Sequence, residues 1–373
     1  MLASGAATKG SGHFRDKMKI LVINGGSSSF KCWLGDLAGE LSSEPVQPLW
    51  TKHIDWKRGA PPADLLRPVL ESLSHKEIEL VGHRIVHGGQ EYRETSWITP
   101  EVRAAIARQV EFAPSHNRFE LEAIGCVDEV LGASVRQVAV FDTGFHETLE
   151  PAAYVYPGPY RWLEEGVRRY GFHGSSFRYA AREAARILGS DSLRLVLCHL
   201  GNGASLAAVR DGRSIDTTMG FTPLEGLMMG SRSGSIDPGI IIYLIRHRGY
   251  TADQLDRLLN QESGLRGISG LSGDMREIVD AIAAGNERAQ LAFDIYAHRL
   301  CREIGAMIGV LGGVDALVFT GGVGENCAPL RERVRRQFEF LGPPRILVIH
   351  AEEEWEIATQ CCQLARATVA RAR

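Results

Sequence analysis

Residues 20–31, ILVINGGSSSFK, are of types that could bind an anion. Four aliphatic residues predict a buried strand, and the two glycines after them predict a tight turn that brings backbone N–H groups close to a ligand. Serine hydroxyls, glycine amides and a lysine ammonium could together bind phosphate oxygens, and these groups belong to Gly25, Gly26, Ser27, Ser29 and Lys31. The segment matches neither the P-loop nor the dinucleotide-binding fingerprint. It therefore indicates a phosphate site of another kind.

Two further glycine-rich segments have a similar layout. Residues 195–209, LVLCHLGNGASLAAV, repeat the order of apolar strand, Asn and Gly in a turn, Ser and a second strand. Residues 319–326, FTGGVGEN, follow a predicted strand and precede a predicted helix, whose N-terminus would suit a nucleotide. The repeat suggests two halves of similar fold with hairpin turns offered to one ligand, although coincidence between two ordinary hairpins is the alternative. A nucleoside triphosphate between two lobes is the simplest explanation.

Charged side chains near these segments could bind an anionic substrate. Arg84 lies in VGHRIVHGG and Arg232 in MMGSRSGSIDPG, where glycine and serine turns leave the guanidinium free for a carboxylate or phosphate. Asp142 ends a predicted buried strand, where a carboxylate is costly unless it serves a charge or a metal. His173 is either functional or a hydrogen-bonded core histidine. The histidines of HRIVH lack the Glu of H-E-x-x-H, so we expect no zinc site there.

The composition narrows the class of protein. The chain has 373 residues, of which 44% are hydrophobic and 23% charged, and its formal net charge of −3 is spread along the chain. This balance argues against a nucleic-acid or membrane-surface partner. Seven cysteines are scattered without a C-x-x-C pair, which fits a reduced cytoplasm. Residues 1–17 are small and polar, and we expect a disordered extension there, with no membrane span elsewhere.

Apolar runs alternate with helical patterns along the chain. The predicted strands are KILVIN, VRQVAVF, LRLVLCHL, DALVFTG and PRILVIH, and the predicted helices include YAAREAARILG, AQLAFDIYAHRLCREIGAMIGVLG and PLRERVRRQFEFLG, each closed by glycine. This alternation predicts an α/β fold. The chain is long for one hydrophobic core, so we expect two domains. Their boundary should lie between residues 145 and 165, where PAAYVYPGPY interrupts the periodicity.

Ten blocks in order resemble the acetate kinase family from Lys19 to about Ala365, and they read NGGSSSFK, GHRIVHGG, APSHN, FDTGFHETL, RYGFHGSS, HLGNGAS, MGFTPLEGLMMGSRSGSIDP, GISGLSGDMRE, FTGGVGEN and EEEWEIA. The resemblance implies the fold of the acetate and sugar kinase, actin and heat-shock-chaperone superfamily. That fold has two ribonuclease-H-like domains of duplicated topology with an interdomain ATP cleft. The N-terminal domain would cover residues 18–150, completed by a C-terminal helix at 359–373. The nucleotide-binding and dimerising domain would cover residues 151–358.

The resemblance also implies an activity and a set of site residues. The activity is reversible phosphoryl transfer from ATP to acetate with Mg²⁺ or Mn²⁺, giving acetyl phosphate and ADP, in a cytoplasmic homodimer that binds neither nucleic acid nor membrane. The implied catalytic residues are Arg84, Asp142, His173 and Arg232. Arg84 would also bind acetate, together with Val86, Ser115, Phe172 and Pro223. The implied metal-binding residues are Asn24 and Glu353, the latter flanked by Glu352 and Glu354. The implied nucleotide-binding residues are Lys31, Ser27, Ser29, His199, Leu200, Gly201, Asn202, Gly203, Asp274, Met275, Arg276, Gly322, Val323, Gly324, Glu325 and Asn326.

The chain departs from the family pattern at four places. The family usually has Leu where this chain has Ser115, a second His where it has Phe177, Phe where it has Met275, and TNEE where it has AEEE at 351–354. The small, polar Ser115 either admits a longer acyl chain or makes the pocket wetter for any acyl group. We expect acetate to remain the main substrate, with propionate closer behind it than in a pocket that contains Leu. We interpret Phe177 as a packing substitution, with loss of a polar contact near the phosphates as the alternative.

The residue types fit this chemistry without reference to the family. Acetate has a pKa of about 4, so it is ionised at neutral pH and its oxygen needs no general base. Transfer between two anions needs positioning and charge neutralisation, which two arginines, an imidazole and Mg²⁺ can supply. Within the class, a propionate kinase is the alternative. Outside it, the alternative is an actin-like or chaperone-like ATPase without acyl transfer, for which the arginine pair and apolar pocket would have no purpose.

Overall fold

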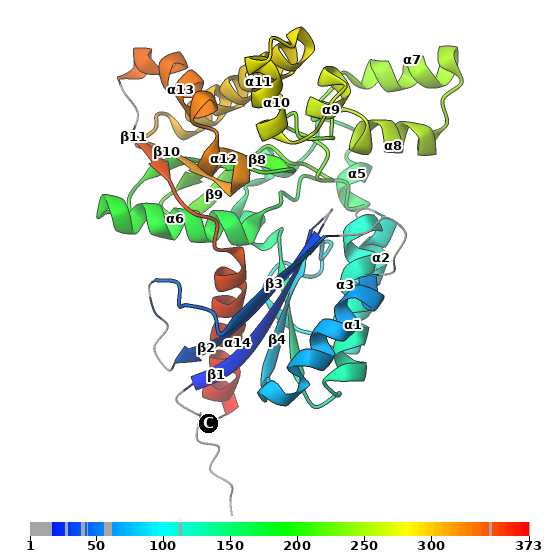
Figure 1. Cartoon of the computed structure of the whole chain (residues 1–373), viewed down its shortest axis with the longest axis vertical. Helices are drawn as coiled ribbons and strands as arrows, with labels where there is room; N and C mark the ends of the chain where they lie inside the picture. Colours follow the sequence, from blue (N-terminus) through cyan, green and yellow to red (C-terminus); the bar gives the residue numbers. More distant parts are fainter. Residues whose placement is uncertain are drawn as a thin grey trace, which may run out of the picture.

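The computed structural model describes residues 17–26, 29–38, 42, 44–55, 62–111, 114–342 and 345–372. They form two mixed sheets with helices packed against them, one sheet in each half of the molecule (Figure 1). This arrangement is the predicted α/β class. None of the helices within these ranges has both the length and the apolar character that crossing a bilayer would require.

The first sheet comes from the N-terminal part of the chain. Its strands are β1 (Lys17–Gly25), β2 (Ser29–Ala38), β3 (Trp50–Asp55), β4 (Leu80–Ile85), β5 (Ser96–Trp97) and β6 (Arg136–Phe141), in the spatial order β3-β2-β1-β4-β6-β5. β1 pairs antiparallel with β2 and parallel with β4, which pairs parallel with β6. The carboxyl ends of β1, β4 and β6 therefore meet at one edge of the sheet. All three strands are largely buried, as their aliphatic runs predict.

The second sheet repeats this topology. Its strands are β7 (Arg194–Leu200), β8 (Ala204–Arg210), β9 (Arg213–Thr217), β10 (Ala316–Thr320) and β11 (Arg345–Val348), in the order β11-β10-β7-β8-β9. β7 pairs antiparallel with β8 and parallel with β10, as β1 does with β2 and β4. β1 and β7 thus hold equivalent positions, and each is followed by its predicted glycine turn. The sequence repeat reflects a duplicated topology rather than coincidence.

Helices cover the faces of the first sheet. α1 (Pro62–Leu73) and α3 (Pro114–Val130) pack on β1 and β2 in one apolar cluster, and α2 (Pro100–Arg108) packs on the ends of β4 and β6. The short 3₁₀ segments η1 (Ser74–Lys76), η2 (Gln109–Glu111) and η3 (Gly144–Thr148) connect these elements. Thr99 caps α2 by accepting a hydrogen bond from the Val102 N–H.

The second half is mainly helical outside its sheet. Its helices are α4 (Pro151–Tyr154), α5 (Arg161–Glu164), α6 (Gly174–Leu188), α7 (Pro238–Arg248), α8 (Ala252–Gln261), α9 (Gly264–Ser269), α10 (Met275–Ala283), α11 (Glu287–Leu311), α12 (Gly321–Asn326) and α13 (Ala328–Gln337), with η4 at Glu339–Leu341. α11 is the predicted long helix, capped by Asn286 at its start and by Gly312 in the left-handed conformation at its end. It lies against β8, α9 and α10 (Figure 1).

The last helix, α14 (Glu353–Ala372), returns from the second half to the first sheet. It packs on β1, β2, β4 and β6 and also on α6. Trp355 lies in one apolar cluster with residues of both sheets and of α6. α14 and α6 therefore fill the space between the two sheets, as Figure 1 shows.

Several predicted boundaries were wrong. The C-terminal helix begins at Glu353 rather than at residue 359, so its first turn belongs to the site described below. Residues 321–326 form the short helix α12 rather than an open turn, because Gly321 takes a positive φ of 77° and starts the helix directly after β10. Lys17 is the first residue of β1, paired with Ala38, and not part of an extension. The rest of that predicted extension, residues 1–16, lies outside the described residues, and the division near residue 150 stays a prediction.

We expect Gly82→Ala to destabilise the protein by loosening α14 from β4. A Cβ at Gly82 would lie 2.6 Å from the Cys361 Sγ and 3.1 Å from the Ile357 Cγ2, so the Cys361 side chain or the helix that carries it must move. Overpacking of this kind costs about 1–3 kcal/mol. The measurement is the free energy of unfolding in urea. Gly125→Ala on α3 is the matched control: its Cβ would meet open space, so it should stabilise the helix by about 0.5–1 kcal/mol. Equal stability of Gly82→Ala and the wild type would contradict this packing.

Candidate active site

A cavity of about 640 Å³ lies at the strand ends where the two halves meet. Ligands of open α/β sheets bind at this position, beyond the carboxyl ends of the strands. Its lining comes from both halves and includes Gly26, Lys31, Arg84, Val86, Asp142, Phe172, His173, His199, Gly201, Asn202, Gly203, Pro223, Arg232, Gly322, Glu325, Asn326 and Glu353. Most of the predicted site residues are therefore brought to one place.

A buried ion pair between Arg84 and Asp142 lies at one side of the cavity. The Arg84 Nε donates to both Asp142 oxygens at 3.0 Å, and Nη2 donates to Oδ2 at 2.5 Å. Nη1 donates to the Gly25 carbonyl at 2.8 Å. Burial raises the pKa of Asp142, and the Arg84 guanidinium opposes that rise. Asp142 is 1% exposed. Its bonds to Arg84 orient the guanidinium.

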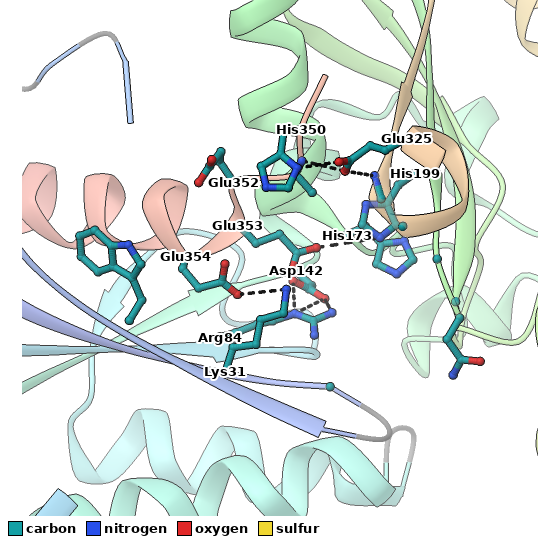
Figure 2. A pocket seen from close by; sticks show the side chains of 18 of the residues that line it. Lys31, Arg84, Asp142, His173, His199, Glu325, His350, Glu352, Glu353 and Glu354 are labelled. Atoms are coloured by element: carbon teal, nitrogen blue, oxygen red, sulfur yellow. Dashed lines mark hydrogen bonds and ion pairs between the residues drawn. The ribbon is translucent and has the colours of Figure 1, made fainter. Parts of the chain in front are cut away.

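The first turn of α14 brings acidic side chains to this pair (Figure 2). The Asn24 Nδ2 donates to the Glu353 Oε2 at 2.9 Å and to the Glu354 Oε1 at 2.7 Å. Burial alone would raise the pKa of Glu353, but the Arg84 guanidinium leads the interactions that outweigh burial and lower the pKa to about 2. The Glu354 Oε1 also lies 3.8 Å from the Lys31 Nζ. Glu353 is therefore an ionised carboxylate inside the cavity.

His173 enters the cavity from the start of α6. It has a positive φ of 61°, which turns the chain from the preceding loop into the helix. Its ring stacks on His199 with 4.2 Å between the centroids, and its Nδ1 lies 2.8 Å from the Ser205 Oγ. Burial, followed by the positive charges around it, holds the pKa of His173 well below its usual value of 6.5. The imidazole is consequently uncharged at neutral pH.

The Arg232 guanidinium is partly buried and lies beside the Pro223 carbonyl. Its Nη1 donates to the Pro223 carbonyl at 3.1 Å, and among the described residues no acidic side chain pairs with it. Burial, with a smaller contribution from Arg84, lowers the pKa of Arg232 to about 10, so it is still charged at neutral pH. A Cβ added to Gly203 would lie 3.5 Å from both the Arg232 Nη1 and the His173 Nε2. The cationic and imidazole groups therefore converge on one small space that the missing side chain of Gly203 leaves open.

An apolar wall borders the same space. Val86 and Phe172 are 2% and 1% exposed and line the cavity together with Pro223. Ser115 lies in the first turn of α3, but its side chain is outside the described part of the chain, as is Ser27. Phe177 is fully buried and touches His173 and His199 with its ring edge, which agrees with a packing role.

A second cavity, of about 970 Å³, adjoins the first through the shared residues Gly201, Asn202, Gly322 and Asn326. The remaining lining includes the predicted Asp274, Met275, Arg276 and Val323, and also Ser231, Arg266, Asp280 and Cys327. Asp274 caps α10 by accepting from the Arg276 N–H at 2.9 Å and also pairs with the exposed guanidinium of Arg276. The two cavities are therefore adjacent and share lining residues from the turn after β7 and from α12.

Three predicted nucleotide residues do not line either cavity. Leu200 is fully buried in the core of the second half, Gly324 is a buried residue of α12, and Ser29 lies at the start of β2. The sequence reasoning also missed residues that do line the first cavity. His350 follows β11 and its Nδ1 lies 2.6 Å from the Glu325 Oε2 (Figure 2). A polar residue directly after an apolar strand was the signal that could have identified it.

An ion pair joins α6 to α14, the two helices whose N-terminal ends carry site residues. The Arg182 Nη1 lies 2.8 Å from the Glu356 Oε2, and Glu356 is 1% exposed. The Gln360 Nε2 donates to the other Glu356 oxygen at 3.1 Å. Since His173 precedes α6 and Glu353 begins α14, this pairing fixes the distance between the imidazole and the carboxylate of the site.

Comparisons with known proteins identify the family. The sequence pattern of the Acetokinase family matches residues 64–359. The acetate kinase of Gloeobacter violaceus is 52% identical over 401 residues, covering 93% of this chain and 99% of that protein. The acetate kinase of Cyanothece sp. is 50% identical over 404 residues, covering 93% and 98% of the two chains.

Solved structures agree. The crystal structure of Porphyromonas gingivalis acetate kinase matches with a TM-score of 0.80 and 37% identity over 93% of this chain and all of that one. A propionate kinase from Francisella tularensis matches with a TM-score of 0.82 and 33% identity over 93% and 99% of the two chains. These matches confirm the predicted α/β fold with two similar domains. The chain therefore belongs to the acetokinase family and is a kinase of that family.

Proposed function

We propose that this kinase transfers the γ-phosphoryl group of ATP to acetate, reversibly and by direct in-line displacement, giving acetyl phosphate and ADP. One observation carries the proposal: the partly buried guanidinium of Arg232, which has no carboxylate partner among the described residues, lies beside an apolar wall that includes Val86. An unpaired, partly buried cation favours an anionic ligand, and the apolar wall favours a small alkyl group. An ATPase without acyl transfer would have no use for this combination.

The charges of the site suit a reaction between two anions. Acetate is already ionised, so its oxygen can attack the γ-phosphorus without a base. Arg84 and Arg232 reduce the repulsion between the carboxylate and the phosphates. Asp142 fixes the orientation of the Arg84 guanidinium. Uncharged His173 can donate one hydrogen bond to the transferring group without releasing a proton. The catalysis is therefore positioning and electrostatic stabilisation rather than acid–base chemistry.

We assign ATP to the two adjoining cavities. The larger one has room for the nucleoside beside Asp274–Arg276, and the phosphates would then pass Gly201–Gly203 toward Arg232. Glycines allow the phosphates to approach the backbone N–H groups closely. Lys31, half exposed at the cavity rim, supplies a mobile ammonium for the terminal phosphates.

The acidic residues fit a magnesium site that substrate phosphates complete. Among the described residues no three His, Cys, Asp or Glu side chains form a metal-binding cluster. Mg²⁺, or Mn²⁺ in its place, usually takes only one or two carboxylates from the protein, with water and phosphate oxygens as its other ligands. Glu353, ionised and held by Asn24, is the carboxylate we assign to it. When bound, the metal supplies neutralisation of the phosphate charge.

We also propose that the protein is located in the cytoplasm. All seven cysteines are free thiols in the structure, and all but Cys301 are buried. Unpaired cysteines are typical of a reducing compartment.

The proposed activity is tested by trapping acyl phosphate as the hydroxamate with ATP, Mg²⁺ and acetate. We expect a strong signal from the wild-type protein. Arg84→Ala and Arg232→Ala should each lower kcat by about 10²–10³, as does loss of one preorganised donor at an oxyanion site. Arg276→Ala is the control, because its guanidinium is exposed and its ion-pair partner among the described residues is Asp274; it should alter the KM for ATP rather than kcat. Near-wild-type turnover in either site variant would refute this assignment of the arginines.

The acyl-chain preference depends on Ser115. We expect propionate to follow acetate closely in kcat/KM, because a Ser in place of the family's Leu leaves more room or more water at the methyl end. Ser115→Leu should shift the ratio of kcat/KM for acetate over propionate toward acetate by about 10-fold, since one methylene is worth about 1–3 kcal/mol. The ratio is measured with the same hydroxamate assay, with butyrate as an additional acceptor. An unchanged ratio would count against a pocket role for this residue, and a propionate maximum in the wild type would reassign the substrate.

We further propose that the protein is a homodimer formed through its second half. α7 has no buried residue, and Ile240, Ile242, Tyr243 and Ile245 are 45–49% exposed along it. Exposed aliphatic residues concentrated on one element mark an interaction surface. Figure 1 places α7 at the outer margin of the second half, away from the first sheet, where a second copy could pack without covering the site.

The pair Ile242→Asp and Ile245→Asp should convert the dimer to a monomer of 40.9 kDa, because each residue buried at an interface centre is worth about 2 kcal/mol. Sedimentation equilibrium measures the mass. Leu291→Asp, at an exposed position of α11, is the control and should leave the mass unchanged. A wild-type protein that sediments as a monomer would exclude the dimer.

A further inference from the structure

Glu120 is a buried carboxyl group behind the acyl pocket. It lies on α3, and its side chain is 2% exposed. The Oε1 accepts a hydrogen bond from the Val86 N–H at 2.9 Å, while Oε2 has no hydrogen-bond partner among the described residues. A buried carboxylate with only one neutral hydrogen bond is strongly disfavoured relative to the uncharged acid.

The charges around Glu120 do not compensate an ionised carboxylate. The groups that act on it are the Arg84 guanidinium on β4 and the Asp142 carboxylate after β6. Arg84 is already paired with Asp142, so the two charges largely cancel at Glu120. His87, which follows Val86, is uncharged at neutral pH, because burial lowers its pKa to about 4. Burial raises the pKa of Glu120 from 4.5 to about 8, more than the Val86 N–H and Arg84 lower it.

We propose that Glu120 is a positioning residue for the carboxylate acceptor: in its neutral form it fixes the Val86 backbone, and its ionisation weakens binding of the acceptor. The inference rests on the proposed function and deepens it. Val86 forms part of the apolar wall and lies two residues after Arg84, so the Val86 N–H bond sets both the wall and the end of the strand that presents the guanidinium. Glu120 itself does not line either of the two cavities assigned to the substrates.

The direction of the pH effect follows from the charges. Ionised Glu120 would compete with acetate for the field of Arg84 and would repel the acetate carboxylate. Acetate binding and ionisation of Glu120 are thus antagonistic, so acetate favours the neutral form. The KM for acetate is therefore low below the pKa of Glu120 and rises above it, whereas the KM for ATP should change little.

The test compares the wild type with Glu120→Gln, Glu120→Ala and the control Glu122→Gln. The Gln variant keeps an acceptor for the Val86 N–H and cannot ionise. The Ala variant lacks both the acceptor and the ionisable group. Glu122 lies on the same helix and pairs at 3.8 Å with Arg118 instead, so its change removes a charge without touching Val86. The KM for acetate, the KM for ATP and kcat are measured from about pH 6.5 to about pH 9, below the range in which Arg232 deprotonates.

We expect the wild-type KM for acetate to rise about tenfold between about pH 7 and about pH 9, as for a single group with a pKa near 8 whose ionised form does not bind acetate. Glu122→Gln should show the same rise. Over the whole pH range, Glu120→Gln should have the KM for acetate that the wild type has at neutral pH. Glu120→Ala should have a KM raised about tenfold at every pH, since the buried Val86 N–H then lacks an acceptor.

An identical rise in the wild type and in Glu120→Gln would overturn the inference while leaving the proposed function intact. Absence of acyl phosphate from the wild type at every pH would instead refute the proposed function. A second readout separates the two outcomes: carbon NMR of glutamate-labelled protein, with Glu120→Gln identifying the resonance. A Glu120 carboxyl that titrates near its ordinary pKa of 4.5 would overturn the inference whether or not acyl phosphate is formed.

Discussion

The ion pair between Arg84 and Asp142 is the interaction on which the site depends. A guanidinium and a carboxylate that are buried separately would each cost several kcal/mol, so the two must stay together. Their pairing fastens β4 to the end of β6, and the remaining Arg84 nitrogen holds the Gly25 carbonyl at the end of β1. Three strand ends are thus fixed relative to one another, and the cavity forms around that fixed point.

The two arginines of the site differ in how they are held, and the difference gives the cavity its polarity. Arg84 is balanced by Asp142, whereas Arg232 is held by a carbonyl and keeps an uncompensated charge. His173 between them stays neutral because burial and the surrounding cations disfavour a further positive charge. The result is a guanidinium without a described carboxylate partner next to an apolar wall, which suits a small carboxylate better than a sugar hydroxyl.

Burial also decides which acidic groups around this centre are charged. Glu353 lies near Arg84 and within hydrogen-bond reach of Asn24, and it is ionised. Glu120, behind Val86, faces a pair of charges that already cancel, and it is neutral. Two glutamates that a sequence treats alike are therefore in opposite charge states, and we propose that Glu353 attracts a cation whereas Glu120 holds the backbone without adding charge.

Much of the fold and of the site could be predicted from the sequence, because those features depend on local patterns. Aliphatic runs identified strands such as β1 and β7, and the glycine turns after them identified the duplicated topology. The blocks around Arg84, Asp142, His173 and Arg232 indicated the family, and the structure brings all four residues to one cavity. Short-range periodicity and turn chemistry are sufficient for these conclusions.

The tertiary structure alone decided which side chains meet. The contact between Asn24 and Glu353 joins residues 329 positions apart, so spacing could not distinguish Glu353 from its acidic neighbours. The packing of α14 against the first sheet brings Glu353 next to Asn24. Glu120 shows no motif, and its neutral state follows only from burial and from a cation already paired with another acid. The sequence by itself determined the strands, the turns and the family; the charge state and partner of each acidic group were decided by the folded environment, because desolvation and electrostatic interactions depend on distance in space and not along the chain.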